Sequence, residues 1–244
     1  MTCVVVGASS GLGRALAEEL VREGHPLVVV SSDERDLQPL AADLAARFGA
    51  DVRTVVADVA EHSDLASALD RAVPPGQPIT ALLFPVGAVE PDDDGSLEPG
   101  LAERLVRVNL LGVSSVVGRF LPRLMAQGHG TIVGFGSVAA LRGRSRNVLY
   151  SAAKRSLESY FESLRHVGEP RGLTVAFYVL GYLDTQLSYG RRLLLPRADP
   201  KRVARRVCRA LGRESGRRYL PWFWYPAAVL IKAIPWAVFR RLRF

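Results

Sequence analysis

Cysteine is scarce in this chain, and the positions of its two cysteines exclude several classes of protein. Cys3 and Cys208 show neither the spacing of metal ligands nor a redox motif. This argues against a disulfide-stapled secreted domain and a cysteine zinc site, and we predict no bound metal. We expect both thiols to be buried in a protein of the reducing cytoplasm.

Linkers are also lacking, and no leader segment is expected. No stretch rich in Gly, Ser or Pro divides the 244 residues, which fit one α/β domain. The apolar run CVVVG already predicts a strand from residue 3, so we expect no signal peptide. With 48% hydrophobic and 23% charged residues, the chain can bury a full core and is not expected to be disordered.

Acidic residues are almost missing from the C-terminal part of the chain. Residues 191–244 hold 15 Lys and Arg against Asp199 and Glu214, whereas the first 190 residues have a net charge of −5. An acidic body with a basic tail argues against nucleic acid as a partner. The Trp, Phe and Leu of the tail favour anionic lipid. The alternative is a general preference for arginine, which supplies 29 of the 32 basic residues.

Short apolar runs alternate with amphipathic stretches, which predicts βαβ units and a parallel sheet. The predicted strands are Cys3–Val6, Leu27–Val30, Val52–Val56, Ile79–Phe84, Thr131–Phe135 and Thr174–Val179, with a short edge strand at Arg218–Leu220. The predicted helices are Leu12–Arg22, Glu34–Phe48, Ser63–Ala72, Gly100–Met125, Val148–Val167 and Pro200–Gly212. The acidic segment PDDDGSLEPG, residues 91–100, is expected to be a solvated loop. Right-handed crossovers then give a doubly wound sheet with a ligand crevice at its carboxyl edge.

A glycine-rich turn follows the first predicted strand. In VVVGASSGLGRALAEEL, Gly7, Gly11 and Gly13 precede a helix with the spacing GxxxGxG. Glycine permits a tight turn and lets backbone N–H groups approach a pyrophosphate at the helix N-terminus. Between a first strand and a first helix, this pattern predicts a dinucleotide site.

A tyrosine and a lysine lie one helical turn apart in YSAAK, residues 150–154, and share one face of a predicted helix. A free phenol has a pKa of about 10. An ammonium about 4 Å away would stabilise the phenolate by roughly 4 kcal/mol at an effective dielectric near 20. We therefore predict that Lys154 lowers the pKa of Tyr150 into the working range of an acid–base catalyst.

Ser137, in IVGFGS, and Asn109, in VRVNLLG, complete a pattern that resembles the short-chain dehydrogenase/reductase family along nearly the whole chain. The resemblance implies a single Rossmann domain with a mostly parallel seven-stranded sheet, helices on both faces, and NAD(P)H-dependent reduction of a ketone. Tyr150 would protonate the carbonyl oxygen, Ser137 would hydrogen-bond it, and Lys154 would hold the ribose. Asn109 would hold a water that links Lys154 to solvent. The resemblance also implies which residues bind the cofactor, NADPH or NADH. They are Gly7, Ser9, Ser10, Gly11, Leu12, Gly13, Ser31, Ser32, Asp58, Val59, Gly87, Tyr150, Lys154 and Thr185.

Three segments depart from the family pattern. FPVG at 84–87 replaces the usual Asn-Asn-Ala-Gly, so contacts to the adenosine side would be altered. Leu180-Gly181 replaces the usual Pro-Gly ahead of the threonine. After the second strand, Asp33 could reach a ribose hydroxyl and Arg35 a 2′-phosphate, so NADH and NADPH both stay open.

The chain ends in PWFWYPAAVLIKAIPWAVFRRLRF, a tail at 221–244 that follows the predicted catalytic domain at 1–220. Leu220–Phe239 is long enough to span a membrane, but two prolines and Lys232 oppose a spanning helix. One side of the tail gathers Ala227, Leu230, Ile231, Ile234 and Val238, and the other gathers Lys232, Arg240 and Arg243. This predicts an amphipathic helix in the membrane interface, with Trp222, Trp224 and Trp236 at headgroup depth. The alternative is a tail packed into a subunit interface or over the active site.

An arginine-rich loop, LRGRSRNVLY, places Arg142, Arg144 and Arg146 between Ser137 and Tyr150. Guanidinium groups bind phosphate oxygens with two parallel hydrogen bonds, and a solvated loop is the alternative. With the tail and the missing Asn-Asn, this loop resembles the bacterial decaprenylphosphoryl-2-keto-pentose 2-reductases. That resemblance implies reduction of a keto sugar on a polyprenyl phosphate for cell-wall polysaccharide, at the cytoplasmic face of the membrane.

Two other functions stay open. A reductase of a free lipid ketone, such as a keto-sphingoid base or a sterol, would have no use for the arginine loop. A non-catalytic dinucleotide-binding scaffold usually lacks the tyrosine or the lysine, and both are present here. The family resemblance also implies a homodimer or homotetramer, assembled through the helices at about 100–125 and 148–167.

Overall fold

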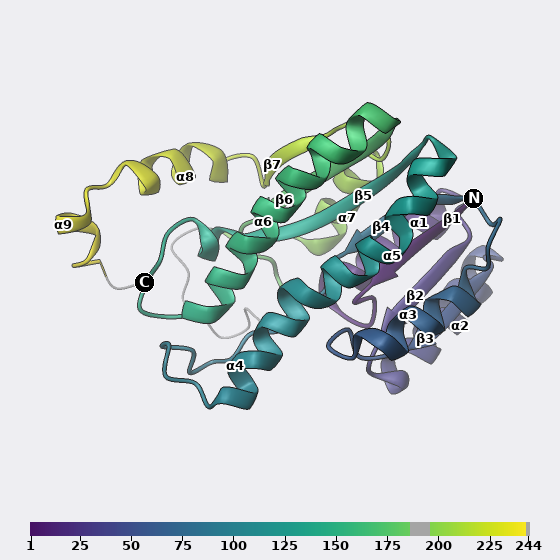
Figure 1. The fold of residues 1–244 in the computed structure, drawn as a ribbon, viewed down its shortest axis with the longest axis horizontal. Coiled ribbons are helices and arrows are strands. Elements are labelled where there is room, and N and C mark those ends of the chain that lie inside the picture. The colour runs from purple at the N-terminus through teal and green to yellow at the C-terminus, as the bar shows by residue number, and fades with distance from the viewer. Residues whose placement is uncertain (186–195, 243–244) are drawn as a thin grey trace.

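Seven parallel strands form one sheet in the computed structural model, which describes residues 1–185 and 196–242 (Figure 1). The strands are β1 (Thr2–Val6), β2 (Leu27–Ser31), β3 (Val52–Val56), β4 (Ile79–Phe84), β5 (Gly130–Ser137), β6 (Leu173–Leu180) and β7 (Gly216–Leu220). They lie in the order β3-β2-β1-β4-β5-β6-β7, with every neighbouring pair parallel. The order reverses between β1 and β4, so the ligand crevice is expected at the carboxyl ends of these two strands. The predicted doubly wound fold is confirmed.

Helices cover both faces of the sheet (Figure 1). One face carries α1 (Gly11–Arg22), α2 (Glu34–Phe48) and α7 (Pro200–Cys208). The other carries α3 (His62–Ala72), α5 (Gly112–Gln127) and α6 (Val148–Gly168). Because both faces are buried, the central strands read as continuous apolar runs, such as VVV in β1 and in β2. Both cysteines are buried, as expected.

The long helix predicted at 100–125 consists of three segments. They are α4 (Pro99–Val106), the π-helical turn η1 (Arg107–Leu111) and α5. Turns of this kind occur often at functional sites, and this one contains the buried Asn109. Within the described residues, Pro99–Gln127 is the helix long and apolar enough to cross a membrane. Its apolar side, including Val113 and Phe120, packs into the core instead.

Most other predicted boundaries agree with the structure to within two residues, and α7 is the exception because it ends at Cys208. Two 3₁₀ turns, η2 (Val138–Ala140) and η3 (Glu169–Arg171), precede and follow α6. The turn η2 matters for the site, because it continues directly from the end of β5 and begins the arginine-rich loop.

The tail is two short helices rather than the single amphipathic helix that was predicted. These are α8 (Trp224–Ala233) and α9 (Trp236–Phe239), which extend beyond β7 (Figure 1). Ile234 between them is extended, because the following Pro235 disfavours helical backbone at the preceding residue.

The tryptophans of the tail have different environments. Trp224 is only 4% exposed and belongs to the core, so its predicted place at headgroup depth is wrong. Trp222 and Trp236 are 76% and 63% exposed. Arg243, which was expected on the polar side of the tail, lies outside the described residues.

Two glycines of α5 provide a test of the packing between α5 and the β3–α3 connection. A Cβ on Gly112 would overlap the carbonyl oxygen of Val59 and lie 2.6 Å from its side chain, whereas a Cβ on Gly118 would meet nothing within 4 Å. Gly112→Ala should therefore lower the free energy of unfolding by about 1–3 kcal/mol. Gly118→Ala, the control, should raise it by roughly 0.5–1 kcal/mol. Urea unfolding measures both, and equal effects at the two positions would contradict this packing.

Candidate dinucleotide and catalytic site

A cavity of about 180 Å³ lies at the carboxyl ends of the central strands. Its lining comes from the turn after β1, the end of β2, the segment after β3, the segment after β4, and α4 with η1. The lining residues are Val6, Gly7, Val30, Ser31, Ser32, Ala57, Asp58, Val59, Gly87, Ala88, Arg104 and Val108. Six of them are among the residues predicted to bind the cofactor. The cavity occupies the switch point where doubly wound sheets bind nucleotides.

The glycine turn after β1 forms a cradle that only glycine can build. Gly7 has a φ of +95° and Gly11 a φ of +50°, a region that other residues rarely adopt. A Cβ on Gly13 would overlap the carbonyl oxygen of Gly7, so this glycine lets α1 pack closely on the turn. The side chain of Ser10, at the N-cap of α1, accepts no bond from the first amides of the helix. The cradle therefore fits a pyrophosphate.

The other residues predicted for the turn differ in exposure. Ser9 is half-buried, while Leu12 is buried in the core under α1. Thr185, predicted to hold the nicotinamide, lies beside the turn: its methyl carbon is 3.3 Å from where a Cβ on Gly11 would stand. The structure thus brings Thr185, from the segment after β6, to the cradle formed after β1.

Asp58 and Arg104 face each other across the mouth of the cavity. Arg104 Nη2 donates to Asp58 Oδ2 at 2.8 Å, and the amide of Ala60 donates to Asp58 Oδ1 at 3.0 Å. Burial alone would raise the pKa of Asp58, but these two donors outweigh it and hold the pKa below its usual value. Arg104 was missed in the sequence, because its partner lies 46 residues away and no motif marks it.

The residues expected to select between the two cofactors are bound to each other. Asp33 caps α2 by accepting from the amide of Arg35, and the Arg35 guanidinium lies 3.1 Å from its carboxylate. The side-chain hydrogen bond from Arg35 is the main cause of the lowered pKa of Asp33. The hydroxyl of Ser31 accepts from the amide of Asp33, and Ser32 is exposed. This pairing favours neither NADH nor NADPH.

Lys154 is buried at the junction of α6 with the two central strands. Its ammonium donates to the carbonyls of Val86 at 3.0 Å and Phe135 at 3.3 Å, and the side chain is only 4% exposed. Burial lowers the pKa of Lys154 to about 8. A Cβ on Gly87 would stand 3.3 Å from this ammonium, so the surviving glycine of the altered FPVG segment gives it room.

Asn109, in η1, also holds the segment that follows β4. Its amide nitrogen donates to the carbonyls of Ala88 at 2.8 Å and Leu105 at 3.0 Å, and its oxygen accepts from the amide of Ala88 at 3.3 Å. The side chain is fully buried. Asn109 therefore fastens the turn after β4 to η1, which is a structural task that the expected water relay did not include.

Tyr150 is half-buried near the start of α6 and is hydrogen-bonded to the side chain of Ser137 at the end of β5. Burial raises its pKa above the ordinary value, while the bond to Ser137 and the positive charge of Arg144 act in the opposite direction. The prediction that Lys154 makes this phenol acidic is wrong for this structure. The ammonium is bonded to two carbonyls, and the charge that acts on the phenol is that of Arg144.

Asp93, from the acidic loop that was expected to be solvated, is buried and holds the first turn of α6. Its carboxylate accepts from the amides of Leu149 at 3.1 Å and Tyr150 at 2.9 Å, and its carbonyl accepts from Val148 at 3.3 Å. Only 1% of the residue is exposed. An anion here complements the helix dipole and fixes the backbone of Tyr150. Sequence gave no signal, because this cap lies more than fifty residues upstream of the helix.

The three arginines predicted to bind a substrate phosphate have different surroundings. Arg142 is bound by the tail: its guanidinium donates to the carbonyls of Ile231 and Ile234, so the prediction does not fit its contacts. Arg144 is half-buried near Tyr150, and Arg146 is exposed. The structure therefore leaves Arg144 and Arg146 as candidates for an anionic substrate group.

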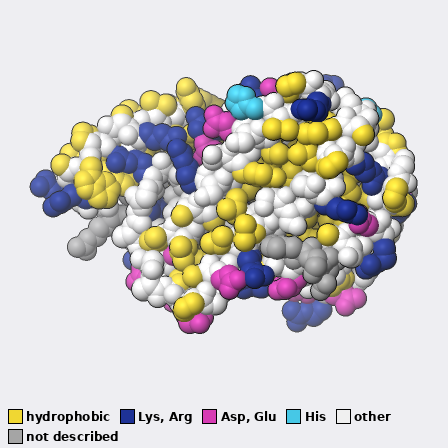
Figure 2. All heavy atoms as spheres, viewed as in Figure 1, with side chains coloured by type: hydrophobic (Ala, Val, Ile, Leu, Met, Phe, Trp, Pro, Cys, Tyr) yellow, Lys and Arg dark blue, Asp and Glu magenta, His cyan; other side chains and the backbone are white. Residues whose placement is uncertain are grey.

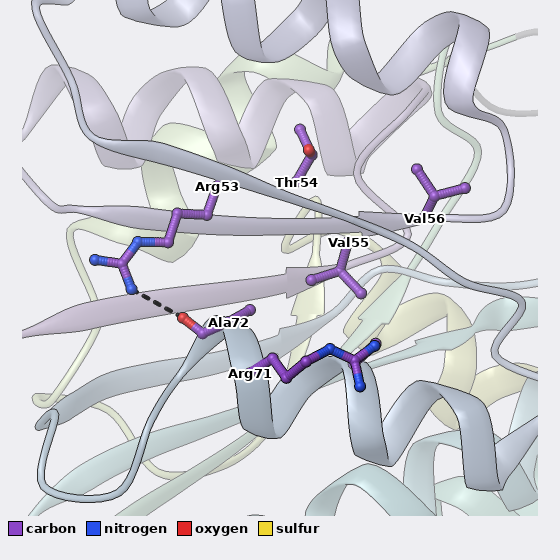
Figure 3. A pocket seen from close by; sticks show the side chains of 7 residues that line it. Arg53, Thr54, Val55, Val56, Arg71 and Ala72 are labelled. Atoms are coloured by element: carbon purple, nitrogen blue, oxygen red, sulfur yellow. Dashed lines mark hydrogen bonds between the residues drawn. The ribbon is translucent and has the colours of Figure 1, made fainter.

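A larger hollow, of about 400 Å³, lies at the outer edge of the sheet between β3 and α3 (Figure 3). Its lining includes Arg53, Thr54 and Arg71, and none of the predicted site residues. Arg53 on β3 donates to the carbonyl of Ala72 at the end of α3, and both residues line the hollow. We therefore assign the chemistry to the smaller cavity at the strand ends.

Comparison with known proteins identifies the family. The family model for short chain dehydrogenases matches residues 1–192, and the chain belongs to this family. A very-long-chain 3-oxoacyl-CoA reductase of Aspergillus fumigatus is 27% identical over 222 residues, which are 87% of this chain and 62% of that protein's length. An uncharacterized oxidoreductase of Staphylococcus saprophyticus is 28% identical over 218 residues, covering 87% of this chain and 91% of the relative.

Solved structures agree with this assignment. A short-chain dehydrogenase from Sphingobium yanoikuyae in complex with NADPH superimposes with a TM-score of 0.82 at 26% identity, covering 97% of each chain. The glycine cradle, the family match and this likeness agree on the doubly wound fold of the short chain dehydrogenases.

Asp93→Ala should loosen the first turn of α6, because the backbone amides of Leu149 and Tyr150 lose a buried carboxylate partner. We expect the free energy of unfolding to fall by about 1–3 kcal/mol. The control is Asp92→Ala, whose side chain is exposed in the same loop. Thermal unfolding of both variants measures the difference, and an unchanged Asp93→Ala protein would contradict the assigned cap.

Lys154 should make stability depend on pH. Burial lowers its folded-state pKa to about 8 from 10.5, so between these values the unfolded chain binds the proton more strongly and stability rises with pH. From pH 8 to 9.5, wild type should gain about 1–2 kcal/mol relative to Lys154→Met, which lacks the titrating group. Urea titrations of both proteins across this range test the expectation. Parallel pH curves would show that Lys154 is not buried as described.

Proposed function

We propose that this protein is an NAD(P)H-dependent reductase that converts a ketone on a lipid-bearing substrate to an alcohol at a membrane surface. The observation that carries the proposal is the hydrogen-bonded pair of Tyr150, on α6 with the buried Lys154, and Ser137, at the end of β5. Ser137 at the end of β5 and Thr185 in the segment after β6 come from neighbouring strands at one edge of the sheet, and Thr185 lies at the glycine cradle.

The residues suit the reductive direction. When bound, the reduced nicotinamide supplies the hydride. The residues that would hold the dinucleotide are the glycine turn, Asp58, Lys154 and Thr185. Tyr150 would donate its proton to the carbonyl oxygen, and Ser137 would hydrogen-bond the same oxygen as negative charge develops there. A phenol whose pKa is raised by burial is protonated at neutral pH, which is the state that a general acid requires.

The substrate class that we favour is a keto sugar on a polyprenyl phosphate. Arg144 lies close enough to Tyr150 for its charge to act on the phenol, and Arg146 is exposed in the same loop. A phosphate bound by this loop would place a neighbouring sugar ketone near the proton donor. Arg142 is not part of this proposal, because the tail occupies its guanidinium.

A second candidate is reduction of a long-chain 3-oxoacyl thioester. The names of several relatives favour it, including those of Aspergillus fumigatus and Anas platyrhynchos, which are very-long-chain 3-oxoacyl-CoA reductases. This chain matches only 62% and 69% of the lengths of these two proteins. In both candidates the ketone is attached to a lipid. They differ in whether the substrate has a keto sugar with a neighbouring phosphate that the arginine-rich loop could bind.

Contact with the membrane is proposed for the outer side of the tail. Among the described residues, the tail holds seven of the twelve exposed large hydrophobic side chains: Trp222, Tyr225, Val229, Leu230, Trp236, Val238 and Leu242. Basic side chains, among them Lys232, Arg240 and Arg241, are exposed beside them, and Figure 2 shows hydrophobic and basic groups together on this part of the molecule. Apolar and basic groups on one surface fit an anionic leaflet on the cytoplasmic side.

Tyr150→Phe should lower kcat for ketone reduction by at least about 10²-fold, because it removes the general acid. NADPH affinity, measured by cofactor fluorescence, should change little. Tyr160→Phe is the matched control on the same helix, where the hydroxyl points to the carbonyl of Ser114. NADPH oxidation would be followed with a long-chain 3-oxoacyl thioester and with a polyprenyl-phosphate keto sugar. Full activity of Tyr150→Phe on a substrate that wild type reduces would overturn the mechanism.

The same assay separates the two substrate classes. If the keto sugar is the substrate, Arg146→Ala should raise its KM because a phosphate ligand is lost. If the thioester is preferred and Arg146→Ala changes nothing, the lipid-linked sugar is the wrong substrate and the second candidate stands.

Trp236→Ser should weaken binding to phosphatidylglycerol vesicles roughly ten-fold, because a large apolar side chain no longer enters the interface. Leu101→Ser is the control, since this exposed leucine lies on α4, away from the tail. Co-sedimentation at low and high salt measures both, and binding should weaken as salt rises. Deletion of the whole tail is less suitable because Trp224 and Ala228 belong to the core. Equal binding by wild type and Trp236→Ser would refute the proposed surface.

A further inference from the structure

The tail rests on two loops that flank the proposed catalytic pair. The first is the loop after β6, which leads to Thr185. The indole of Trp224 lies directly against Gly181 in this loop, so that an added Cβ on the glycine would overlap the indole nitrogen. The ring of Tyr182 meets the same indole edge-on, with 5.3 Å between centroids. A glycine at 181, the residue kept from the usual Pro-Gly pair, is therefore needed for the tail to pack here.

The second loop is the arginine-rich segment after Ser137, and Arg142 joins it to the tail. Its guanidinium donates to the carbonyl of Ile231 at 3.3 Å and also to the carbonyl of Ile234. These carbonyls belong to the C-terminal end of α8, where the helix dipole is negative. The same guanidinium lies 4.0 Å from the ring centroid of Phe239 in α9, a residue that is almost fully buried.

Arg142 thus contacts both helices of the tail and links them to the loop that leads to Tyr150. A planar guanidinium suits this task because it donates in several directions in its plane and packs against an aromatic ring with its face. Arg146 belongs to the same loop but is exposed. Membership of this loop therefore does not by itself bring an arginine against the tail.

We propose that Arg142 is a positioning residue that latches the tail across the substrate side of the site, so that the tail forms one wall of it. The inner side of the tail, with Trp224 and Phe239, faces the two loops, while its outer side carries the exposed apolar groups. The inference deepens the proposed function, on which it rests for the identity of the site. A lipid-bearing substrate would reach the catalytic pair along this wall.

The tail carries its own optical probe, because Trp222, Trp224 and Trp236 are the only tryptophans in the chain. Energy transfer from tryptophan to bound NADPH therefore reports the distance from the tail to the cofactor. In wild type with saturating NADPH, we expect quenched tryptophan emission and sensitised nicotinamide emission. Arg142→Ala should lose much of this sensitised emission while its NADPH dissociation constant stays unchanged, since Arg142 does not line the cofactor cavity.

The control is Arg218→Ala, which removes the same charge from β7, where the guanidinium donates to the neighbouring carbonyl of Arg217. It should transfer energy like wild type. If Arg142→Ala does not fold, Phe239→Ala removes the same contact from the tail side and should show the same loss. Because the assay uses NADPH alone, it can fail while ketone reduction and the effect of Tyr150→Phe stand.

Wild-type energy transfer in folded Arg142→Ala would overturn the latch. If the same variant also raises KM for a phosphate-bearing substrate only, Arg142 returns to phosphate binding. Loss of transfer in Arg142→Ala and Phe239→Ala, but not in Arg218→Ala, supports it.

Discussion

The buried ammonium of Lys154 is the interaction on which the site depends. An ammonium taken out of water costs several kcal/mol unless hydrogen bonds replace its hydration. Here the carbonyls of Val86 and Phe135 accept from it, and they belong to the segments at the ends of β4 and β5. The same bonds hold α6 against those two strand ends. Asn109 and Gly87 then shape the turn after β4 around this group.

The helix α6, which carries Tyr150, is thereby fixed at two places. Asp93 holds its first turn through backbone amides, and Lys154 anchors it one turn further along. Tyr150 lies between these two anchors, with Ser137 bonded to its side chain. Such prior fixation is what general acid catalysis needs, because donors that are already placed need not reorganise as charge develops.

Much of this arrangement could be predicted from the sequence, and what could not has physical reasons. Apolar periodicity gave β3, β4 and α2 with their observed limits, and local motifs marked Gly7, Tyr150 and Lys154. Contacts between residues far apart in the chain left no such mark. Asp93 and Arg104 were missed because their partners lie dozens of residues away. The expected effect of Lys154 on Tyr150 was wrong because spacing alone does not tell which acceptors a buried ammonium meets.

The inner side of the tail packs on Gly181 after β6 and on Arg142 in the arginine-rich loop, while its outer side carries exposed apolar side chains. The central claim is that the nicotinamide lies between Thr185 and Tyr150. A crystal structure of the NADP⁺ complex tests it most directly. The account predicts the pyrophosphate on the glycine turn and the reactive carbon of the nicotinamide facing the Tyr150 hydroxyl, with room for a carbonyl about 3–3.5 Å from each. A dinucleotide bound elsewhere, or a Tyr150 hydroxyl turned away from its nicotinamide ring, would contradict it.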